Sequence, residues 1–186
     1  MSKEEQNPWQ TLQVKTVYES PWIAVHHHDV LNPAGNPGTY SVVHFKKLAI
    51  GILPLDENMN TWLVGQYRYP LNTYTWEIPE GGGNRDETTL ESAKRELLEE
   101  CGLEAAEWKL IQQLQLSNSA TDEVAFLFIA KGLTQKIAQP EETEQLQIKK
   151  VSFDEAYAMV CDGIITDSLS VAAILKARLL LLENKL

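Results

Sequence analysis

The chain has 186 residues, of which 44% are hydrophobic and 23% charged, and its formal net charge is −10. This length suffices for one domain with a small extension, and the composition is that of a globular protein rather than a disordered one. The acidic excess argues against a non-specific nucleic-acid-binding protein and against attachment to anionic lipid, because both need a cationic surface.

Cysteine content and hydropathy bear on where the protein resides. The two cysteines, Cys101 and Cys161, are too few and too far apart to predict a disulfide framework or a zinc site. The polar N-terminus lacks the apolar core of a signal peptide. The most apolar stretch, residues 171–182, is interrupted by Lys176 and Arg178 and is too short to span a bilayer. We therefore expect a cytoplasmic protein with no membrane partner.

The first part of the chain is predicted to consist of strands, because segments rich in β-branched and aromatic residues alternate with turn signals. A turn at residues 56–60 begins like a calcium loop, but Thr61 stands where that loop needs glycine, so a hairpin turn is favoured. Three consecutive histidines, residues 26–28, are interpreted as half-exposed strand residues rather than metal ligands. The expected strands are Leu12–Tyr18, Trp22–Leu31, Thr39–Phe45, Leu48–Leu55 and Trp62–Tyr67.

Helical periodicity first occurs at Thr88–Cys101, with a possible capping box at Thr88 and Glu91 and a stop signal at Gly102. Strands first and helices later indicate an α+β fold. We expect residues 1–45 to form a strand-rich lobe and residues 46–186 to form the second domain. The remaining expected elements are strands at Trp108–Leu116, Val124–Ala130 and Gln145–Val151, and helices at Phe153–Cys161 and Ser168–Leu182.

Three carboxylates of the first helix share one face. Glu96, Glu99 and Glu100 stand at i, i+3 and i+4, where like charges destabilise a helix by ~0.2–0.5 kcal/mol per pair. They also lie near its C-terminal end, where the helix dipole disfavours anions. Three hard oxygen ligands on one face suit Mg²⁺, with Mn²⁺ as a possible substitute. A solvated acidic face is the alternative interpretation of the helix taken alone.

The residues around these carboxylates favour the metal site. Arg95 lies four residues before Glu99 and is placed to orient its carboxylate through a charge-assisted hydrogen bond. Three glycines, Gly81–Gly83, are predicted to form a loop in which the backbone can approach a metal closely.

The pattern Gly-x5-Glu-x7-Arg-Glu-Leu-x-Glu-Glu-x-Gly-Leu, from Gly81 to Leu103, resembles a complete Nudix box. The resemblance implies an α/β/α sandwich and Mg²⁺-dependent hydrolysis of a nucleoside diphosphate linked to another moiety. It also implies that Glu96, Glu99 and Glu100 are metal ligands, joined by the backbone carbonyl of Glu80, with Glu99 in the catalytic group as well.

Sequence similarity outside the box indicates which branch of the family the chain resembles. The runs Gly65–Pro70 and Trp76–Gly81 resemble the ADP-ribose and nucleotide-sugar pyrophosphatases, in which a strand-rich N-terminal lobe takes part in a domain-swapped homodimer. By position in that branch, Glu142 would be the general base and Glu144 an additional metal ligand. A solvated acidic loop is the alternative for residues 141–146.

The sequence signals for substrate-binding residues and for the identity of the substrate are less specific than the box. Arg68 is predicted to bind a phosphate through its planar fork, and Trp22 and Tyr40 to stack on the base, with an ion pair and core or dimer contacts as the respective alternatives. Asn118 stands where the ADP-ribose branch usually has proline, so a broader nucleoside diphosphate sugar hydrolase fits at least as well. A non-catalytic Nudix-like nucleotide sensor is the competing function, but such a sensor would be expected to lack box carboxylates.

Overall fold

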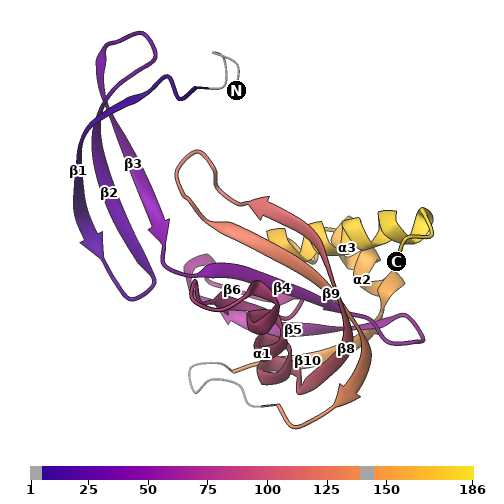
Figure 1. Cartoon of the computed structure of the whole chain (residues 1–186). Helices are drawn as coiled ribbons and strands as arrows, with labels where there is room; N and C mark the ends of the chain where they lie inside the picture. Colours follow the sequence, from indigo (N-terminus) through magenta and orange to yellow (C-terminus); the bar gives the residue numbers. More distant parts are fainter. Residues whose placement is uncertain (1–5, 139–144) are drawn as a thin grey trace. The chain divides into compact units, whose positions relative to one another are not determined.

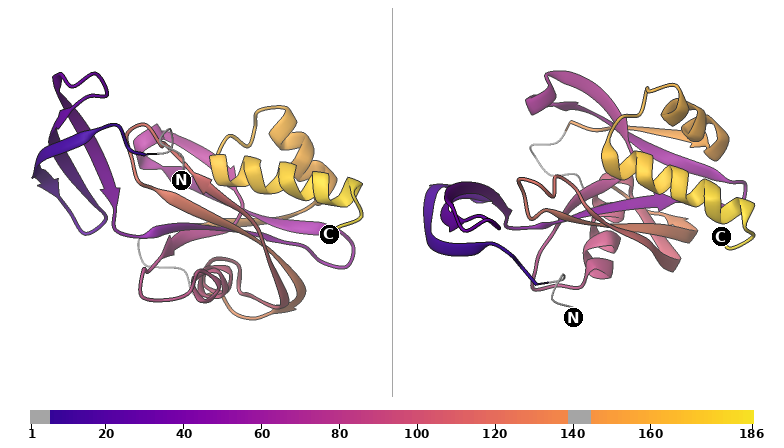
Figure 2. Two further views of the ribbon diagram at one scale, coloured as in Figure 1. Left: turned by 45° about the horizontal axis from the view of Figure 1, so that its top comes forward. Right: turned by 90° about the horizontal axis from the view of Figure 1, so that it is seen from above.

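The computed structural model describes residues 6–138 and 145–186. The chain forms two compact units (Figures 1 and 2). The first holds the described residues up to Lys47 together with Gln115–Glu123, and the second holds Leu48–Leu114 and Val124–Leu186. The first unit thus combines the strand-rich N-terminal residues with a segment from much later in the sequence.

An antiparallel sheet of three strands, in the order β1-β2-β3, makes up most of the first unit. Its members are β1 (Gln10–Glu19), β2 (Ile23–Leu31) and β3 (Pro37–Phe45). The segment 115–123 is attached to β3, because Val43 N donates to Ala120 O at 2.9 Å.

Among the described residues of the second unit, the chain forms two sheets and three α-helices. One sheet has the order β10-β5-β6 and the other has the order β7-β4-β9-β8. β4 pairs parallel with β9 and antiparallel with β7. The strands are β4 (Leu48–Pro54), β5 (Asn60–Arg68), β6 (Thr73–Glu77), β7 (Glu80–Gly83), β8 (Leu103–Gln115), β9 (Val124–Gln135) and β10 (Gln147–Ser152). The helices are α1 (Thr89–Cys101), α2 (Phe153–Cys161), α3 (Ser168–Leu182) and a short 3-10 helix, η2 (Tyr69–Leu71).

Helices cover both faces of the sheet that contains β4. Helix α1 packs against β4 and β7, whereas α3 packs against β4 and β9, and the left view of Figure 2 shows α1 on the opposite side of the strands from α2 and α3. The core between them includes Ile50, Ile52 and Leu97, all with 0% exposure. The predicted α+β class and α/β/α sandwich are confirmed.

The expected strands and helices are present, with two omissions and one correction. Strands β6 and β7 were not predicted, and β8 and β9 are longer than expected. Gly81–Gly83 were expected in a loop, but they belong to β7, an edge strand in which Gly81 is the pairing partner of Ile50. Glycine has no strand preference of its own, so only pairing with β4 reveals this strand.

Two local predictions are confirmed. The chain turns at residues 56–60, where Asp56 Oδ1 accepts hydrogen bonds from Asn58 N and Asn60 N at 2.9 and 2.7 Å. Helix α1 begins with the capping box of Thr88 and Glu91 and ends at Gly102 in the left-handed conformation (φ 62°). Within the described part of the chain, no helix combines the length and apolar character needed to cross a membrane.

Candidate active site

Helix α1 buries both its apolar stripe and two of its carboxylates. Ala93 and Leu97 are fully buried, as the spacing of apolar residues predicts. Glu96 and Glu100 are also buried, with 8% and 3% exposure. Acidic residues are almost never buried to this extent unless they are paired, so the face that carries them is built to hold charge.

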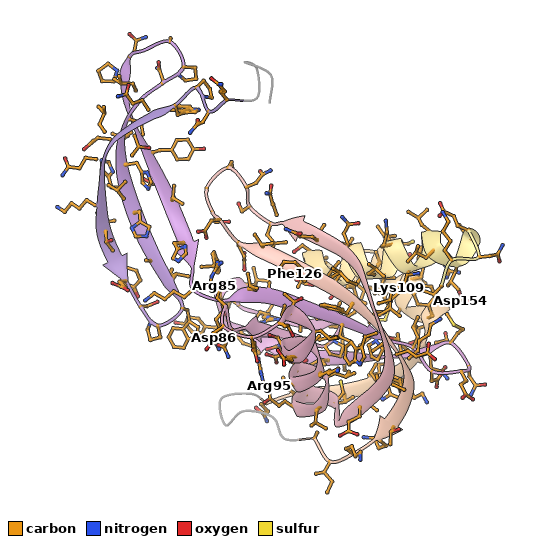
Figure 3. All side chains as sticks on the ribbon, in the orientation of Figure 1. Arg85, Asp86, Arg95, Lys109, Phe126 and Asp154 are labelled. Atoms are coloured by element: carbon orange, nitrogen blue, oxygen red, sulfur yellow. The ribbon has the colours of Figure 1, made fainter. Side chains whose placement is uncertain are left out.

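Arg95 is the cation at the centre of this acidic face, and Figure 3 shows it projecting from α1. Its Nη1 donates to Glu96 Oε1 at 2.8 Å and to Glu99 Oε2 at 2.9 Å, so the expected bond to Glu99 is present. Its Nη2 donates to Gly82 O at 3.0 Å and to Glu87 Oε1 at 3.4 Å. Burial alone would lower the pKa of Arg95, but the neighbouring Glu96 and Glu99 raise it overall, so the guanidinium stays charged.

Gly81 leaves the space in which the Glu96 carboxylate lies. A Cβ atom added to Gly81 would be 2.2 Å from Glu96 Oε2, which is far inside van der Waals contact. A side chain at this position would therefore force the Glu96 carboxylate to move away from β7. The same closeness brings the backbone of residues 80–82 against the acidic face.

Glu80 is linked to the helix through its backbone. Glu80 N donates to Glu100 Oε2 at 2.9 Å, which joins the start of β7 to the end of α1. The Glu80 side chain has a raised pKa, first because it is buried and then because Asp167 and Glu77 place negative charge near it, although Arg68 opposes the shift.

The donor set at this face suits a hard divalent cation. Carboxylate and carbonyl oxygens are the ligands that Mg²⁺ and Mn²⁺ prefer, and Glu87, Glu96 and Glu99 share the single positive charge of Arg95. Across residues 6–138 and 145–186, no three His, Cys, Asp or Glu side chains are gathered tightly enough to hold a metal ion. Instead, the carboxylates are directed toward Arg95 and the Glu80 N–H. The metal-ligand assignment stays a prediction that the chemistry of the residues supports.

Arg68, predicted to bind a phosphate, is held by two carboxylates. Its Nη2 donates to Glu77 Oε2 at 2.5 Å and to Glu80 Oε1 at 2.6 Å, and its side chain is 34% exposed. These are the contacts of the alternative interpretation, an ion pair at the end of a strand. Its role toward a phosphate stays a prediction.

The two aromatic residues predicted to stack on a base lie in the first unit. Trp22 is 68% exposed. Tyr40 donates from its hydroxyl to Ser119 O at 2.8 Å and packs edge-to-face on Trp9, with ring centroids 5.7 Å apart. Tyr40, Trp9 and His28 help to line a pocket of about 250 Å³. Stacking on a base by either residue stays a prediction.

Glu142 and Glu144, predicted as base and additional ligand, lie outside the described residues. The structure also adds residues that the sequence analysis did not assign. Glu87 accepts hydrogen bonds from Arg95 and from Ser92 Oγ, and the Nudix box itself was the signal that could have identified it. Glu77, which binds Arg68, is recognisable only from the tertiary contacts.

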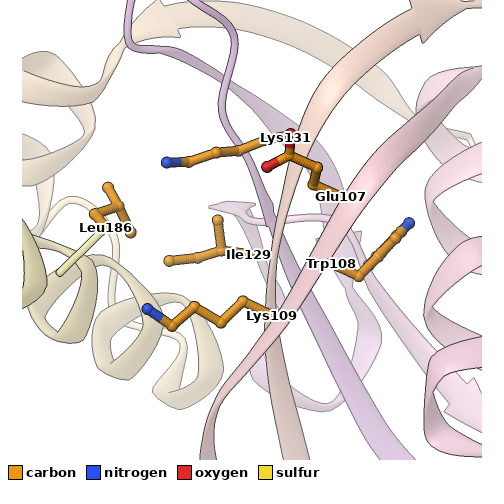
Figure 4. Close-up of a pocket in the computed structure, with 6 residues that line it drawn as sticks. All are labelled: Glu107, Trp108, Lys109, Ile129, Lys131 and Leu186. Atoms are coloured by element: carbon orange, nitrogen blue, oxygen red, sulfur yellow. The ribbon is translucent and has the colours of Figure 1, made fainter.

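A second pocket lies away from the acidic face. It has a volume of about 140 Å³ and contains no residue of the box. Figure 4 shows Lys109 and Lys131 at its margin and Ile129 between them, with Leu186 opposite. Lys109 Nζ donates to Lys185 O at 2.5 Å and Leu186 lines the pocket, so residues 185 and 186 adjoin it.

Family models and a solved structure agree with the described geometry. Residues 45–165 match the NUDIX domain, and residues 9–43 match the nucleoside diphosphate sugar hydrolase N-terminal domain. The crystal structure of an ADP compounds hydrolase superposes with a TM-score of 0.85 at 21% identity, covering 96% of this chain and 97% of the other. At this identity the structural likeness establishes the fold.

Relatives of known activity align over most of this chain. An ADP-ribose pyrophosphatase of Mycobacterium tuberculosis is 30% identical over 91% of this chain and 83% of its own length. A methanol dehydrogenase activator of Bacillus methanolicus and an ADP-ribose pyrophosphatase of Bacillus subtilis are 28% and 25% identical, each over 88% of this chain and 89% of the relative. The chain therefore belongs to the Nudix family, as a hydrolase that acts on a pyrophosphate bond.

Proposed function

We propose that this protein is a Mg²⁺-dependent pyrophosphohydrolase of nucleoside diphosphate sugars of the ADP-ribose, ADP-glucose or GDP-mannose type. Its products would be a nucleoside monophosphate and a sugar phosphate. The N-terminal domain match and the ADP-ribose pyrophosphatase relatives support this substrate class. A cytoplasmic location stays a prediction from the composition.

The observation that carries the proposal is the acidic face of α1 against β7. Glu96 and Glu100 are buried, Glu99 is held by Arg95, and the Glu80 backbone adjoins them at a distance set by Gly81. A divalent ion held by these carboxylates would supply positive charge to offset that of a diphosphate and would lower the pKa of attacking water. Concentrated negative charge in a hydrolase of anionic substrates is otherwise unfavourable, because it would repel the substrate.

The chain's own residues have separate tasks in this proposal. Arg95 holds Glu96 and Glu99 in place, and Glu80 N holds Glu100. We assign the proton of the attacking water to Glu142 and an additional ligand position to Glu144, on the family resemblance. No strong general acid is needed, because the leaving group is itself a phosphate.

Recognition of the base and phosphates is proposed for Tyr40, Trp22 and Arg68. The pocket beside Tyr40 is lined by Trp9 and His28, and aromatic rings of this kind suit a planar heterocycle. Replacement of Tyr40 by alanine should raise KM with little change in kcat if the residue only binds the base.

The test of the proposed function is a substrate panel. Purified protein with Mg²⁺ is incubated with ADP-ribose, ADP-glucose, GDP-mannose and UDP-glucose, and release of nucleoside monophosphate is measured. Turnover of at least one of them is expected, together with its loss on chelation of the metal. Absence of turnover for all four would exclude the proposed substrate class.

The same panel separates the enzyme from a non-catalytic nucleotide sensor. A sensor would bind a nucleotide sugar, detectable by calorimetry, without releasing a monophosphate. The complete set of box carboxylates favours the enzyme, since a sensor has no need to keep three like charges on one helix face.

A further inference from the structure

Glu77, at the end of β6, is a buried carboxylate to which the proposed reaction assigns no task. It is 2% exposed, yet it accepts hydrogen bonds from three side chains. Arg68 Nε donates to both of its oxygens at 3.0 Å, and Thr75 Oγ1 donates to Oε1 at 2.7 Å. Gln66 Nε2 adds a longer bond of 3.4 Å. A buried carboxylate without such partners would destabilise the fold, so these hydrogen bonds are required for Glu77 to be buried here.

The network leads from Glu77 to the start of β7. One nitrogen of Arg68, Nη2, donates both to Glu77 Oε2 at 2.5 Å and to Glu80 Oε1 at 2.6 Å. Burial by itself would lower the pKa of Arg68, but Glu77 and Glu80 raise it overall. Because Glu77 holds one side of the planar guanidinium, the orientation of Arg68 is fixed. Its second hydrogen bond can then be made only in the direction of Glu80.

Glu80 in turn connects this network with the acidic face. Its N–H donates to Glu100 Oε2, and its backbone carbonyl is a proposed metal ligand. The chain just before it is fixed, because Ile52 N donates to Pro79 O at 2.8 Å and Ile78 N donates to Ser170 Oγ at 2.9 Å. Pairing of β7 with β4 places Glu80 opposite Gly51, and Arg68 adds a contact to the Glu80 side chain.

We propose that Glu77 is a positioning residue for the metal site, acting through Arg68 and Glu80 on the orientation of Glu100. This inference rests on the proposed function, because it assumes that Glu100 and the Glu80 carbonyl bind the metal. Outer partners that orient ligands typically change metal affinity or activity by ~10–100-fold when they are removed. In this proposal Glu77 acts on the metal site through Arg68 and Glu80 and is not itself a ligand.

The test replaces Glu77 by glutamine, which keeps the shape but removes the charge that holds Arg68. Binding of Mn²⁺ to the full chain without substrate is measured by electron paramagnetic resonance of the free ion. E77Q should bind Mn²⁺ about 10-fold more weakly than wild type. With saturating metal, KM for the substrate should change by less than the Mn²⁺ affinity does, because Arg68 keeps its contact with Glu80. Unchanged Mn²⁺ affinity with a raised KM would overturn the inference, since Glu77 would then act on Arg68 as a phosphate ligand.

A matched control and a milder variant keep the result interpretable. Thr61 is fully buried in the same sheet, and its hydroxyl bonds to no described residue, so Thr61→Val should leave Mn²⁺ affinity unchanged. Thr75→Val removes one bond to Glu77 and keeps the carboxylate, so a smaller loss in the same direction is expected. If E77Q does not fold, wild-type affinity in Thr75→Val would overturn the inference.

Failure of the inference and failure of the proposed function give different results. Weaker Mn²⁺ binding in E77Q, without turnover of any nucleotide sugar by wild type, would refute the function and support the positioning role. Turnover by wild type with equal Mn²⁺ affinity in both proteins would refute the positioning role alone. Absence of Mn²⁺ binding by wild type would overturn both.

Discussion

Single residues set the geometry of the acidic face. Gly81 does so because it has no side chain to displace the Glu96 carboxylate. Because a Cβ at Gly81 would lie 2.2 Å from the Glu96 carboxylate, Gly81→Ala should displace Glu96 and lower activity by ~10-fold or more. Gly38→Ala is the control, since the nearest atom to a Cβ there is 4.0 Å away. Initial rates and melting temperatures of both variants are compared. Wild-type activity in Gly81→Ala would show that the Glu96 position is unimportant.

A substitution at Glu100 can test the charge of its side chain separately from its hydrogen bond to the Glu80 N–H. In Glu100→Gln the amide oxygen can still accept the hydrogen bond from Glu80 N, so the fold should persist while the charge is lost. Activity should fall by more than the ~10–100-fold typical of an outer partner. Glu104→Gln, just beyond the helix and exposed, should retain wild-type rates. Steady-state kinetics with circular dichroism measure both effects, and near-wild-type rates in Glu100→Gln would refute the ligand role.

At the scale of elements, the turn between β4 and β5 depends on Asp56. Burial would raise the pKa of Asp56, but hydrogen bonds from Lys150, Asn60 and Asn58 lower it well below the ordinary value. A carboxyl with a depressed folded pKa stabilises the fold above its unfolded pKa of ~3.9, and this contribution is lost as pH falls toward the folded pKa. Asp56→Asn should therefore lower the free energy of unfolding by about 1–2 kcal/mol at pH 7. The difference from wild type should shrink below pH ~4.

Urea unfolding at several pH values measures this effect. The neighbouring Glu57, exposed in the same turn, is the control, and Glu57→Gln should stay within about 0.5 kcal/mol of wild type. A destabilisation of Asp56→Asn that does not vary with pH would contradict the assignment to charge.

At the scale of the whole molecule, the exposed apolar residues of β1 in the first unit indicate a surface for dimer formation. All ten residues of β1 are exposed, and Leu12, Val14, Val17 and Tyr18 are each more than half exposed. Apolar surface of this kind is usually covered by a partner, which supports the homodimer expected from the family resemblance. Light scattering after size exclusion should give twice the chain mass of 21.0 kDa. The double variant Leu12→Glu and Val14→Glu should shift the mass toward the monomer, whereas Gln13→Glu should not. A monomeric wild type would refute the dimer.

Local sequence was sufficient for the helix that carries the acidic face. Its capping box, its apolar stripe and its terminal glycine all lie within a few residues of each other, so short-range rules predicted α1 correctly. The strand β7 was missed because its glycines carry no strand signal and pair with β4 only in the folded chain. The length of β8 was underestimated for a related reason, since polar residues such as Glu104 and Glu107 interrupt its apolar pattern.

The sequence by itself determined the family, the acidic helix face and the chemistry of its ligands, because the box is a continuous motif of 23 residues. Only the tertiary structure decided which groups those side chains meet. Arg68 binds Glu77 and Glu80, Gly81 makes room for Glu96, and Glu80 N reaches Glu100. The contacts to Gly81 and Glu80 N join residues 15 and 20 positions apart, and the pairing of β7 with β4 sets them, so no local pattern of residue types could have specified them.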